Sequence, residues 1–285
     1  MQPQEYHLTI TPYNAANSPA ELLAEASGLS RQQVKEAMQQ GAVWLGSGGH
    51  TRRLRRHKTR LKPGDQLHLY YNPAVLEQQP PAAQLIADEG DYSVWCKPPG
   101  MLSQGSKWSD HTTITRWAEL HLQPQRPALL VHRLDRAAGG LILIAHAKGM
   151  ARKLAALFEA RQIEKQYQVI VEGKFPGKPA QHRFEQPLDD KPALSIVQRL
   201  AFDPLAKRSL LQVDIETGRK HQIRRHLAMT GFPVVGDRLY GDADTQDDLQ
   251  LTAVSLAFDH PVSGEARRYE LAEELRPKLP PPAQD

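Results

Sequence analysis

Three ionisable side chains, His132, Arg133 and Asp135, lie between two apolar stretches, residues 130–131 and 141–144. Short apolar runs are typical of buried strands, and a loop between them presents its side chains from a rigid frame to a cleft. A carboxylate held among cations in such a loop is a candidate for acid–base or nucleophilic chemistry. Taken alone, the pattern also fits a turn or helix cap at Asp135 with solvated neighbours.

A second charged cluster, residues 216–226, favours the functional interpretation. It begins where the alternating apolar residues Leu211, Val213 and Ile215 predict the end of a strand, and it contains arginines, a lysine and histidines. Burial raises the pKa of an aspartate and keeps the carboxyl protonated, so an ionised Asp135 needs a neighbouring cation. The second cluster can supply that cation.

Four sequence blocks occur in an order that resembles one enzyme family. The blocks are KPPG at 97–100, HRLD at 132–135, EKQYQVIV at 164–171, and GRKHQIR at 218–224 running on to GDRLYG at 236–241. On these blocks, over roughly residues 90–260, the chain resembles the RluA-type pseudouridine synthases, which isomerise uridine in RNA. The family more usually has Asp-Thr-Ser-Gly after the arginine that follows its catalytic aspartate. Here residues 137–140 are Ala-Ala-Gly-Gly, so the loop lacks those hydroxyls but keeps the carboxylate.

The resemblance implies three catalytic residues. Asp135 would attack the nucleotide or deprotonate the ribose, and both possibilities stay open. Arg224 would favour the ionised carboxylate and orient it with two hydrogen bonds from its planar guanidinium. Because uracil inside a helix is unreachable, the base would be flipped out, and Tyr167 would stack on it and take or relay the proton from carbon 5. Without the resemblance, Tyr167 would be an ordinary half-buried strand tyrosine.

Other residues of the same blocks are candidate substrate contacts. Arg133 lies two residues before Asp135, so both point to one face of an extended strand. Arg133 would bind a phosphate or enter the stack that the base vacates, with a structural ion pair as the alternative. The full set of candidates is Lys97, His132, Arg133, Arg219, His221, Gln222 and Ile223.

The chain is expected to form two domains. Residues 1–72 predict a small α/β module, with helices capped by Ser18 and Ser30 and strands at 42–45 and 66–71. This order resembles the small RNA-binding module of a ribosomal small-subunit protein. Residues 73–84 would be a linker and 277–285 a disordered tail. For residues 85–276 the resemblance implies an α+β catalytic domain with a mixed, largely antiparallel sheet, in which 147–160 predict an amphipathic helix.

A dense basic run, residues 52–62, lies between the two predicted strands of the small module. The plain interpretation of such a run is a solvated loop, but an RNA-modifying context favours contacts with phosphates. The candidate RNA-binding residues of the module are Arg31, Arg52, Arg53, Arg55, Arg56, Lys58 and Arg60.

Composition limits the classes of function. The chain has 285 residues, a net charge of +4 and a pI near 9.1, which permit an RNA partner without requiring one. The single cysteine, Cys96, excludes an intramolecular disulfide and a cysteine-based metal site, and the 12 histidines form no HExxH pattern. We expect no metal and no cofactor. Because the sequence shows neither a signal peptide nor a membrane span, we expect a cytoplasmic monomer without a membrane partner.

Together these features predict an enzyme, an RNA pseudouridine synthase that isomerises specific uridines in structured RNA through Asp135 and base flipping. The front module favours ribosomal RNA over transfer RNA. The first alternative is a non-catalytic RNA-binding or ribosome-assembly protein that keeps the fold, which the departure at residues 137–139 supports. The second is a base-flipping glycosylase, which would release free uracil.

Overall fold

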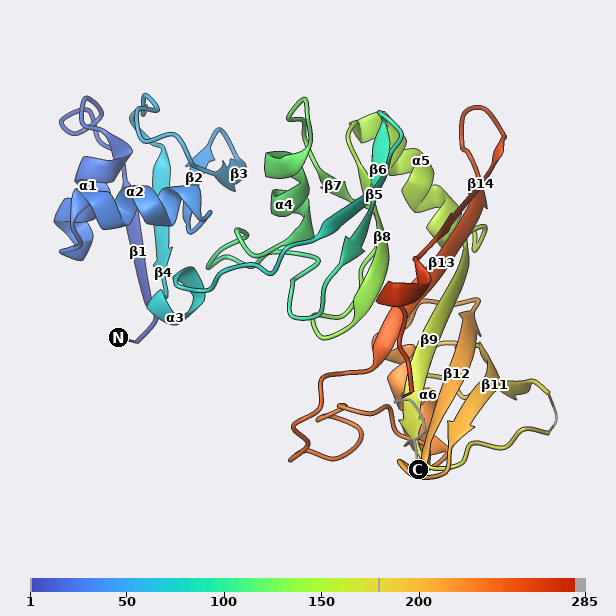
Figure 1. Ribbon diagram of the computed structural model, residues 1–285. Helices are drawn as coiled ribbons and strands as arrows, with labels where there is room; N and C mark the ends of the chain where they lie inside the picture. Colours follow the sequence, from blue (N-terminus) through green and yellow to red (C-terminus); the bar gives the residue numbers. More distant parts are fainter. Residues whose placement is uncertain (1, 179, 280–285) are drawn as a thin grey trace. The chain divides into compact units, whose positions relative to one another are not determined.

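The computed structural model describes residues 2–178 and 180–279 (Figure 1). The chain divides into two compact units. The small unit comprises the chain up to Pro80 together with Gln104–Trp117, and the large unit comprises Pro81–Ser103 and the chain from Ala118 onward. The predicted boundaries did not include the return of Gln104–Trp117 to the small unit. Residues 280–285 of the predicted disordered tail lie outside the described residues.

The small unit has two helices, α1 (Pro19–Ser27) and α2 (Arg31–Gln39). As predicted, Ser18 and Ser30 cap them, because each side chain accepts a hydrogen bond from the backbone N–H three residues ahead. Gly28 ends α1 in the left-handed conformation, with φ of 72°.

The sheet of the small unit packs one face against these helices. Its strands are antiparallel in the order β1–β4–β2–β3, with Leu67 and Leu69 of β4 in the core. The bounds are β1 Gln4–Thr9, β2 Val43–Ser47, β3 His50–Arg53 and β4 Gln66–Tyr71. The start of the basic run is therefore a strand, not a loop. The predicted linker begins with the short helix α3 (Pro73–Leu76), whose Leu76 is buried in the same core.

The large unit is built on one mixed sheet, in the strand order β10–β11–β12–β9–β13–β8–β6–β5, with β14 beside β13 and β7 beside β8. Of the strand pairs in its described residues, β13 and β8 run parallel and the others antiparallel. The predicted α+β fold with a mixed, largely antiparallel sheet is confirmed. The bounds are β5 Gln84–Asp88, β6 Tyr92–Lys97, β7 Leu129–Leu130, β8 Gly139–Ala145, β9 Glu164–Glu172, β10 His182–Phe184, β11 Ser195–Asp203, β12 Arg208–Ile215, β13 Leu251–Asp259 and β14 Ala266–Glu270.

Two helices of the large unit pack against its sheet. The predicted amphipathic helix is α5 (Lys148–Glu159), which follows β8 and buries Met150 and Leu154 (Figure 1). The helix α6 (Gln222–Met229) carries the second charged cluster. The remaining helical segments are α4 (Ile114–His121) and the 3-10 turn Glu273–Leu275. No helix of the described chain combines the length and the apolar character that crossing a membrane requires.

The loop that carries Asp135 is fixed by the start of β8. Gly140 pairs with Ala253 of β13 and has φ of 104°. A Cβ atom at this position would lie 2.2 Å from the carbonyl oxygen of Ala253, so no other residue fits. Gly140 thus allows β8 to approach β13 and sets where the loop ends.

Candidate active site

Asp135 lies in the loop between β7 and β8, and 29% of its side chain is exposed. Its Oδ2 accepts a hydrogen bond from Nη1 of Arg224 at 3.3 Å, and its Oδ1 lies 3.7 Å from Nε2 of His221. The structure therefore brings the two charged clusters together. It places a partly accessible carboxylate between two nitrogen donors.

Arg224 makes its two-hydrogen-bond interaction with Asp237 and not, as predicted, with Asp135. Its Nε and Nη2 donate to Oδ2 and Oδ1 of Asp237 at 2.8 and 2.6 Å, and Asp135 receives a single, longer hydrogen bond. Both partners of the fork are almost completely buried. Burial lowers the pKa of Arg224, but the hydrogen bonds and charge of Asp237 outweigh it and raise that pKa above its ordinary value. The expectation of two hydrogen bonds from Arg224 to Asp135 was wrong. The buried guanidinium of Arg224 pairs most closely with the fully buried carboxylate of Asp237, because a buried charge needs a partner that is itself inside the protein.

Sequence reasoning assigned no role to Asp237, although it lies in the GDRLYG block. Besides the two bonds from Arg224, its Oδ1 accepts the backbone N–H groups of Leu239 and Tyr240 at 3.0 and 3.1 Å. These four hydrogen bonds outweigh the effect of burial and lower the pKa of Asp237. Asp237 therefore anchors Arg224 and folds its own loop. The signal that could have found it is the acidic residue of the GDRLYG block, because Arg224, always charged and on the buried face of α6, needs a buried partner.

His221 connects Asp135 to that same loop. It has a left-handed backbone, with φ of 53°, just before α6, and its Nδ1 lies 2.9 Å from the hydroxyl of Tyr240. Burial lowers the pKa of His221, which favours the neutral ring at neutral pH. A carboxylate can only accept, so the proton on Nε2 suits Asp135 and leaves Nδ1 to accept from Tyr240. The Tyr240 ring also lies 5.2 Å from the guanidinium carbon of Arg224.

Tyr167 stands on β9 and is 9% exposed. Burial, and then the charge of Asp135, raise the pKa of its phenol. The phenol therefore keeps its proton at neutral pH. It can donate or relay a proton, but a phenolate base is disfavoured.

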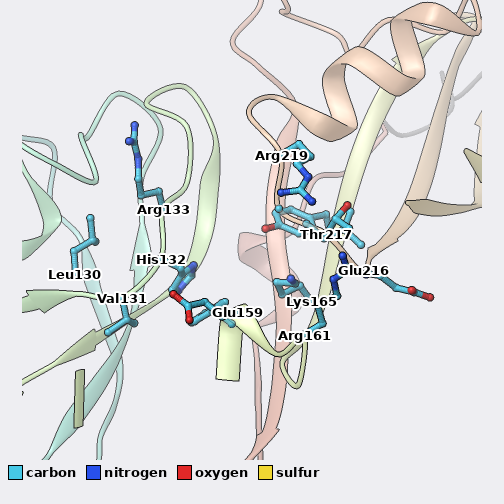
Figure 2. Close-up of a pocket in the computed structure, with 14 residues that line it drawn as sticks. Leu130, Val131, His132, Arg133, Glu159, Arg161, Lys165, Glu216, Thr217 and Arg219 are labelled. Carbon is cyan, nitrogen blue, oxygen red and sulfur yellow. The ribbon is translucent and has the colours of Figure 1, made fainter. Parts of the chain in front are cut away.

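Two adjoining cavities meet at this tyrosine. The smaller, about 100 Å³, is lined by Asp135, Tyr167, His221 and Arg224 among others. The larger, about 680 Å³, lies between residues 130–133 on one wall and Arg161, Lys165 and residues 215–219 on the other (Figure 2). Both cavities share the residues Arg133, Tyr167, Ile215, Gly218 and Arg219.

The predicted substrate contacts separate into two groups. Arg133 and Arg219 line both cavities, and Ile223 lines the smaller one. Gln222 also borders the smaller cavity, but its amide is saturated by Thr217, Arg219, Leu194 and Ser195. Gln222 therefore holds the polypeptide together at the site.

Lys97 is fully buried and reaches neither cavity, which argues against the predicted substrate contact. Its ammonium donates to the carbonyls of Pro98, Met101, Arg136 and Ala138 at 2.6–3.4 Å. Burial lowers the pKa of Lys97 to about 8, although the charge of Asp135 opposes the shift. Because the carbonyls of Arg136 and Ala138 follow Asp135 closely in sequence, Lys97 helps to fix the backbone of the loop that carries Asp135.

His132 has a structural hydrogen bond as well. Its Nε2 accepts from the N–H of Leu143 at 2.9 Å, and its ring stacks on Phe158 at 4.4 Å between centroids. Burial lowers its pKa to about 3, so the ring is neutral. His132 lines the larger cavity as an aromatic surface and not as a cation.

In the small unit, the basic run divides into internal and exposed side chains. Arg53 and Arg55 both bind Asp110, at 2.9 and 2.5 Å, and their other nitrogens donate to the carbonyls of Gly41, Ser106 and Gln39. These two arginines hold the segment Gln104–Trp117 and are not available as the predicted RNA contacts. The other candidates are exposed, with Arg31 paired to Glu21; they are Arg31, Arg52, Arg56, Lys58 and Arg60.

Comparison with known proteins identifies the family. The family model described as RNA pseudouridylate synthase matches residues 91–229. The dual-specificity RNA pseudouridine synthase RluA of Vibrio vulnificus is 31% identical, over 67% of this chain and 84% of its own length. The tRNA pseudouridine synthase C of Yersinia pestis is 33% identical, over 60% of this chain and 78% of its own length. The chain belongs to the RNA pseudouridine synthases.

As a member of the RNA pseudouridine synthases, the protein is an isomerase that modifies RNA, so the expectation of an enzyme is confirmed. A solved human structure, RNA Pseudouridylate Synthase Domain Containing 1, shares the fold with a TM-score of 0.58 at 20% identity. The matched region covers 69% of this chain and 86% of the human chain.

Proposed function

We propose that this RNA pseudouridine synthase is of the RluA type and isomerises a uridine flipped out of structured RNA, with Asp135 as the catalytic carboxylate. The observation that supports this most is the position of Asp135 in a cavity wall, with Arg224 and His221 beside its two oxygens. The likeness to the relative named RluA supports the type.

The reaction breaks the bond between C1′ of the ribose and N1 of uracil and forms a bond between C1′ and C5. The proton leaves C5 and N1 gains one, so atoms balance without an oxidant or reductant. Asp135 either adds to the nucleotide or removes a ribose proton, and its partial exposure fits both. Arg224 compensates its negative charge where water is partly excluded, and the neutral ring of His221 presents its Nε2 proton to the carboxylate.

Tyr167 is proposed to stack on the detached uracil, because its ring lines both cavities beside Asp135. Its phenol stays protonated, so it would relay the C5 proton by giving up its own as it accepts another. Arg133, exposed at the mouth of both cavities, would bind a phosphate or fill the space that the base leaves.

The small unit is proposed to bind RNA through its exposed cations Arg52, Arg56, Lys58 and Arg60. Its two capped helices and sheet support the resemblance to a ribosomal-protein RNA-binding module. We favour ribosomal RNA on that ground, while the relative named tRNA pseudouridine synthase C supports transfer RNA as the alternative. We further propose that the protein acts as a cytoplasmic monomer.

Mapping pseudouridines in total RNA, with and without the gene, tests this function. We expect one or a few sites to lose the modification in the deletion strain, mainly in ribosomal RNA, and to regain it when purified protein is added to that RNA. Loss at transfer RNA sites would reassign the substrate. An unchanged map together with inactive purified protein would contradict the proposed activity, and free uracil among the products would indicate a glycosylase.

A further inference from the structure

The cavity around Asp135 is too small to hold a nucleotide by itself. Its volume is about 100 Å³, whereas sites for small ligands span roughly 300–1,000 Å³. The adjoining cavity, at about 680 Å³, falls within that range. A nucleotide whose sugar or base reaches Asp135 must therefore extend into the larger cavity.

Cations outnumber acids in the walls of the larger cavity. Arg133 projects from one wall and Arg161, Lys165 and Arg219 from the other (Figure 2), against the two carboxylates Glu159 and Glu216. Within residues 2–178 and 180–279, the side chains of Arg133, Arg161 and Lys165 have no hydrogen bond or ion pair with the protein, while Nε of Arg219 donates to the carbonyl of Pro192. Among the described residues, three cations of this cavity are thus unpaired.

Lys165 is the most constrained of these cations. It is half-buried, and burial followed by the nearby charge of Arg161 lowers the pKa of its ammonium. A partly dehydrated cation without a counter-charge is stabilised by an anion that enters the site. Lys165 also precedes Tyr167 by two residues on the same face of β9, about 7 Å along the strand. That separation is comparable with the distance from a stacked base to the phosphate of its own nucleotide.

We propose that the larger cavity binds a phosphodiester of the RNA strand next to the target uridine, held by Lys165 and Arg161 from one wall and by Arg133 and Arg219 from the rim. This rests on the proposed function, since Tyr167 must hold the base. The ligand class is a backbone phosphate of RNA. His132, with its ring stacked on Phe158, supplies the apolar side of the cavity.

The test replaces Lys165 by methionine, which keeps the long apolar stem and removes the charge. The matched control is Lys153→Met, because Lys153 is exposed on α5 and does not line the cavity. The probe is total RNA from cells that lack the gene. Affinity is measured over a series of salt concentrations, and pseudouridine formation is measured as KM and kcat.

We expect Lys165→Met to weaken RNA binding and raise KM several-fold, with kcat at saturating RNA within about two-fold of wild type. The negative slope of log affinity against log salt should become shallower by about 0.7, the value for one lost single-strand phosphate contact. Lys165→Arg should restore both values, which shows that charge and not folding is responsible. Lys153→Met should change neither.

Two results would overturn this inference. One is an affinity and salt slope for Lys165→Met equal to those of the control variant. The other is a fall in kcat with unchanged affinity, which would make Lys165 a support for Tyr167 and not a phosphate ligand. Because the salt slope needs no turnover, it tests the phosphate site even if wild-type protein forms no pseudouridine. That last result would contradict the proposed function alone.

Discussion

Each unit of the protein contains a cluster of arginine and aspartate. The cluster of the large unit has one more carboxylate than arginine, and the cluster of the small unit has one more arginine than carboxylate. In the large unit one arginine, Arg224, serves two carboxylates, Asp237 and Asp135. In the small unit two arginines, Arg53 and Arg55, share the single carboxylate of Asp110 and use their other donors on backbone carbonyls. The first cluster presents a carboxylate to a cavity, whereas the second turns its cations inward to hold a segment of the chain.

The difference shows that the residues of one charged motif can have two different roles, one stabilising the fold and the other exposed to a cavity. A buried charge must be paired, so the residue with the best geometry becomes structural and the remaining one is free to act. Asp237, with no exposed side-chain surface, takes the fork of Arg224, and Asp135, 29% exposed, keeps one long hydrogen bond. Charge density in a sequence locates both clusters but does not say which member is left over.

The largest expected effect comes from removing the free carboxylate. Asp135→Asn is nearly isosteric but lacks the charge that either role of Asp135 requires, so turnover should fall at least about 100-fold. RNA affinity should stay within about two-fold. The measurement is pseudouridine formation by purified protein, with Asp244→Asn, an exposed site of the same unit, as control. Turnover by Asp135→Asn within about ten-fold of that of the control variant would remove Asp135 from the mechanism and end the contrast with the small unit.

The next effect compares the two structural carboxylates directly. Asp237→Asn leaves Arg224 buried beside a neutral amide, and should cost about 3–5 kcal/mol of stability in the large unit. Asp110→Asn should cost less, about 1–3 kcal/mol in the small unit, because its pair is partly exposed. Hydrogen exchange, read separately for peptides of each unit, measures both. Equal losses would show that burial does not separate the clusters.

The pH dependence of the same pair sharpens this comparison. The pKa of Asp237 is lowered in the folded protein, so its contribution is present above the unfolded value of about 3.9 and is lost as pH falls through the folded value. The stability difference between wild type and Asp237→Asn should therefore be constant near neutral pH and shrink below about pH 4. A difference that grows on acidification would contradict the ion pair as its source.

Much of the site could be predicted because its signals are local or come in ordered blocks. The meeting of Asp135 with the second cluster followed from two motifs at strand ends, and α5 followed from its apolar spacing. The role of Asp237 could not be predicted, because the local sequence does not indicate which of two carboxylates accepts both hydrogen bonds from a guanidinium. The buried position of Lys97 was missed for the same reason, since its four carbonyl partners lie in two separate loops.

The small unit shows the other limit of sequence reasoning. Capping serines define α1 and α2 locally, but β1 at the sheet edge and the short helix α3 carry weak local signals. The return of Gln104–Trp117 to this unit joins segments that are far apart in sequence. It is this segment, through Asp110, that converts two arginines of a basic run into internal residues.

Two substitutions of Tyr167 test whether the cavity beside Asp135 binds a flipped-out base. Tyr167→Phe keeps the ring and loses the phenol, so RNA affinity should hold while turnover falls. Tyr167→Ala loses the stacking surface too, worth about 1–3 kcal/mol for a base on an aromatic ring, and should bind RNA at least several-fold more weakly. Binding and single-turnover rates on total RNA distinguish the two. A fully active Phe variant would leave the ring essential and exclude the proton relay.

The smallest effect should come from the exposed half of the basic run. Arg52 and Arg56 are exposed, whereas Arg53 and Arg55 are held by Asp110. The double change Arg52→Gln with Arg56→Gln should weaken RNA binding with kcat unchanged. The salt slope should fall by about 0.7 for each phosphate that is no longer bound. The double change Arg53→Gln with Arg55→Gln should instead loosen Gln104–Trp117, seen as faster hydrogen exchange in that segment.

These two double variants are matched in charge and in position along the chain, so they separate the functions of neighbouring arginines. Any general effect of net charge on RNA binding is the same in both, because each removes two positive charges. A salt slope that falls only for the exposed pair would support phosphate binding at Arg52 and Arg56. A slope unchanged by the exposed pair would make the run a solvated surface, and RNA binding by the small unit would then have to rest on other residues, such as Lys58 and Arg60.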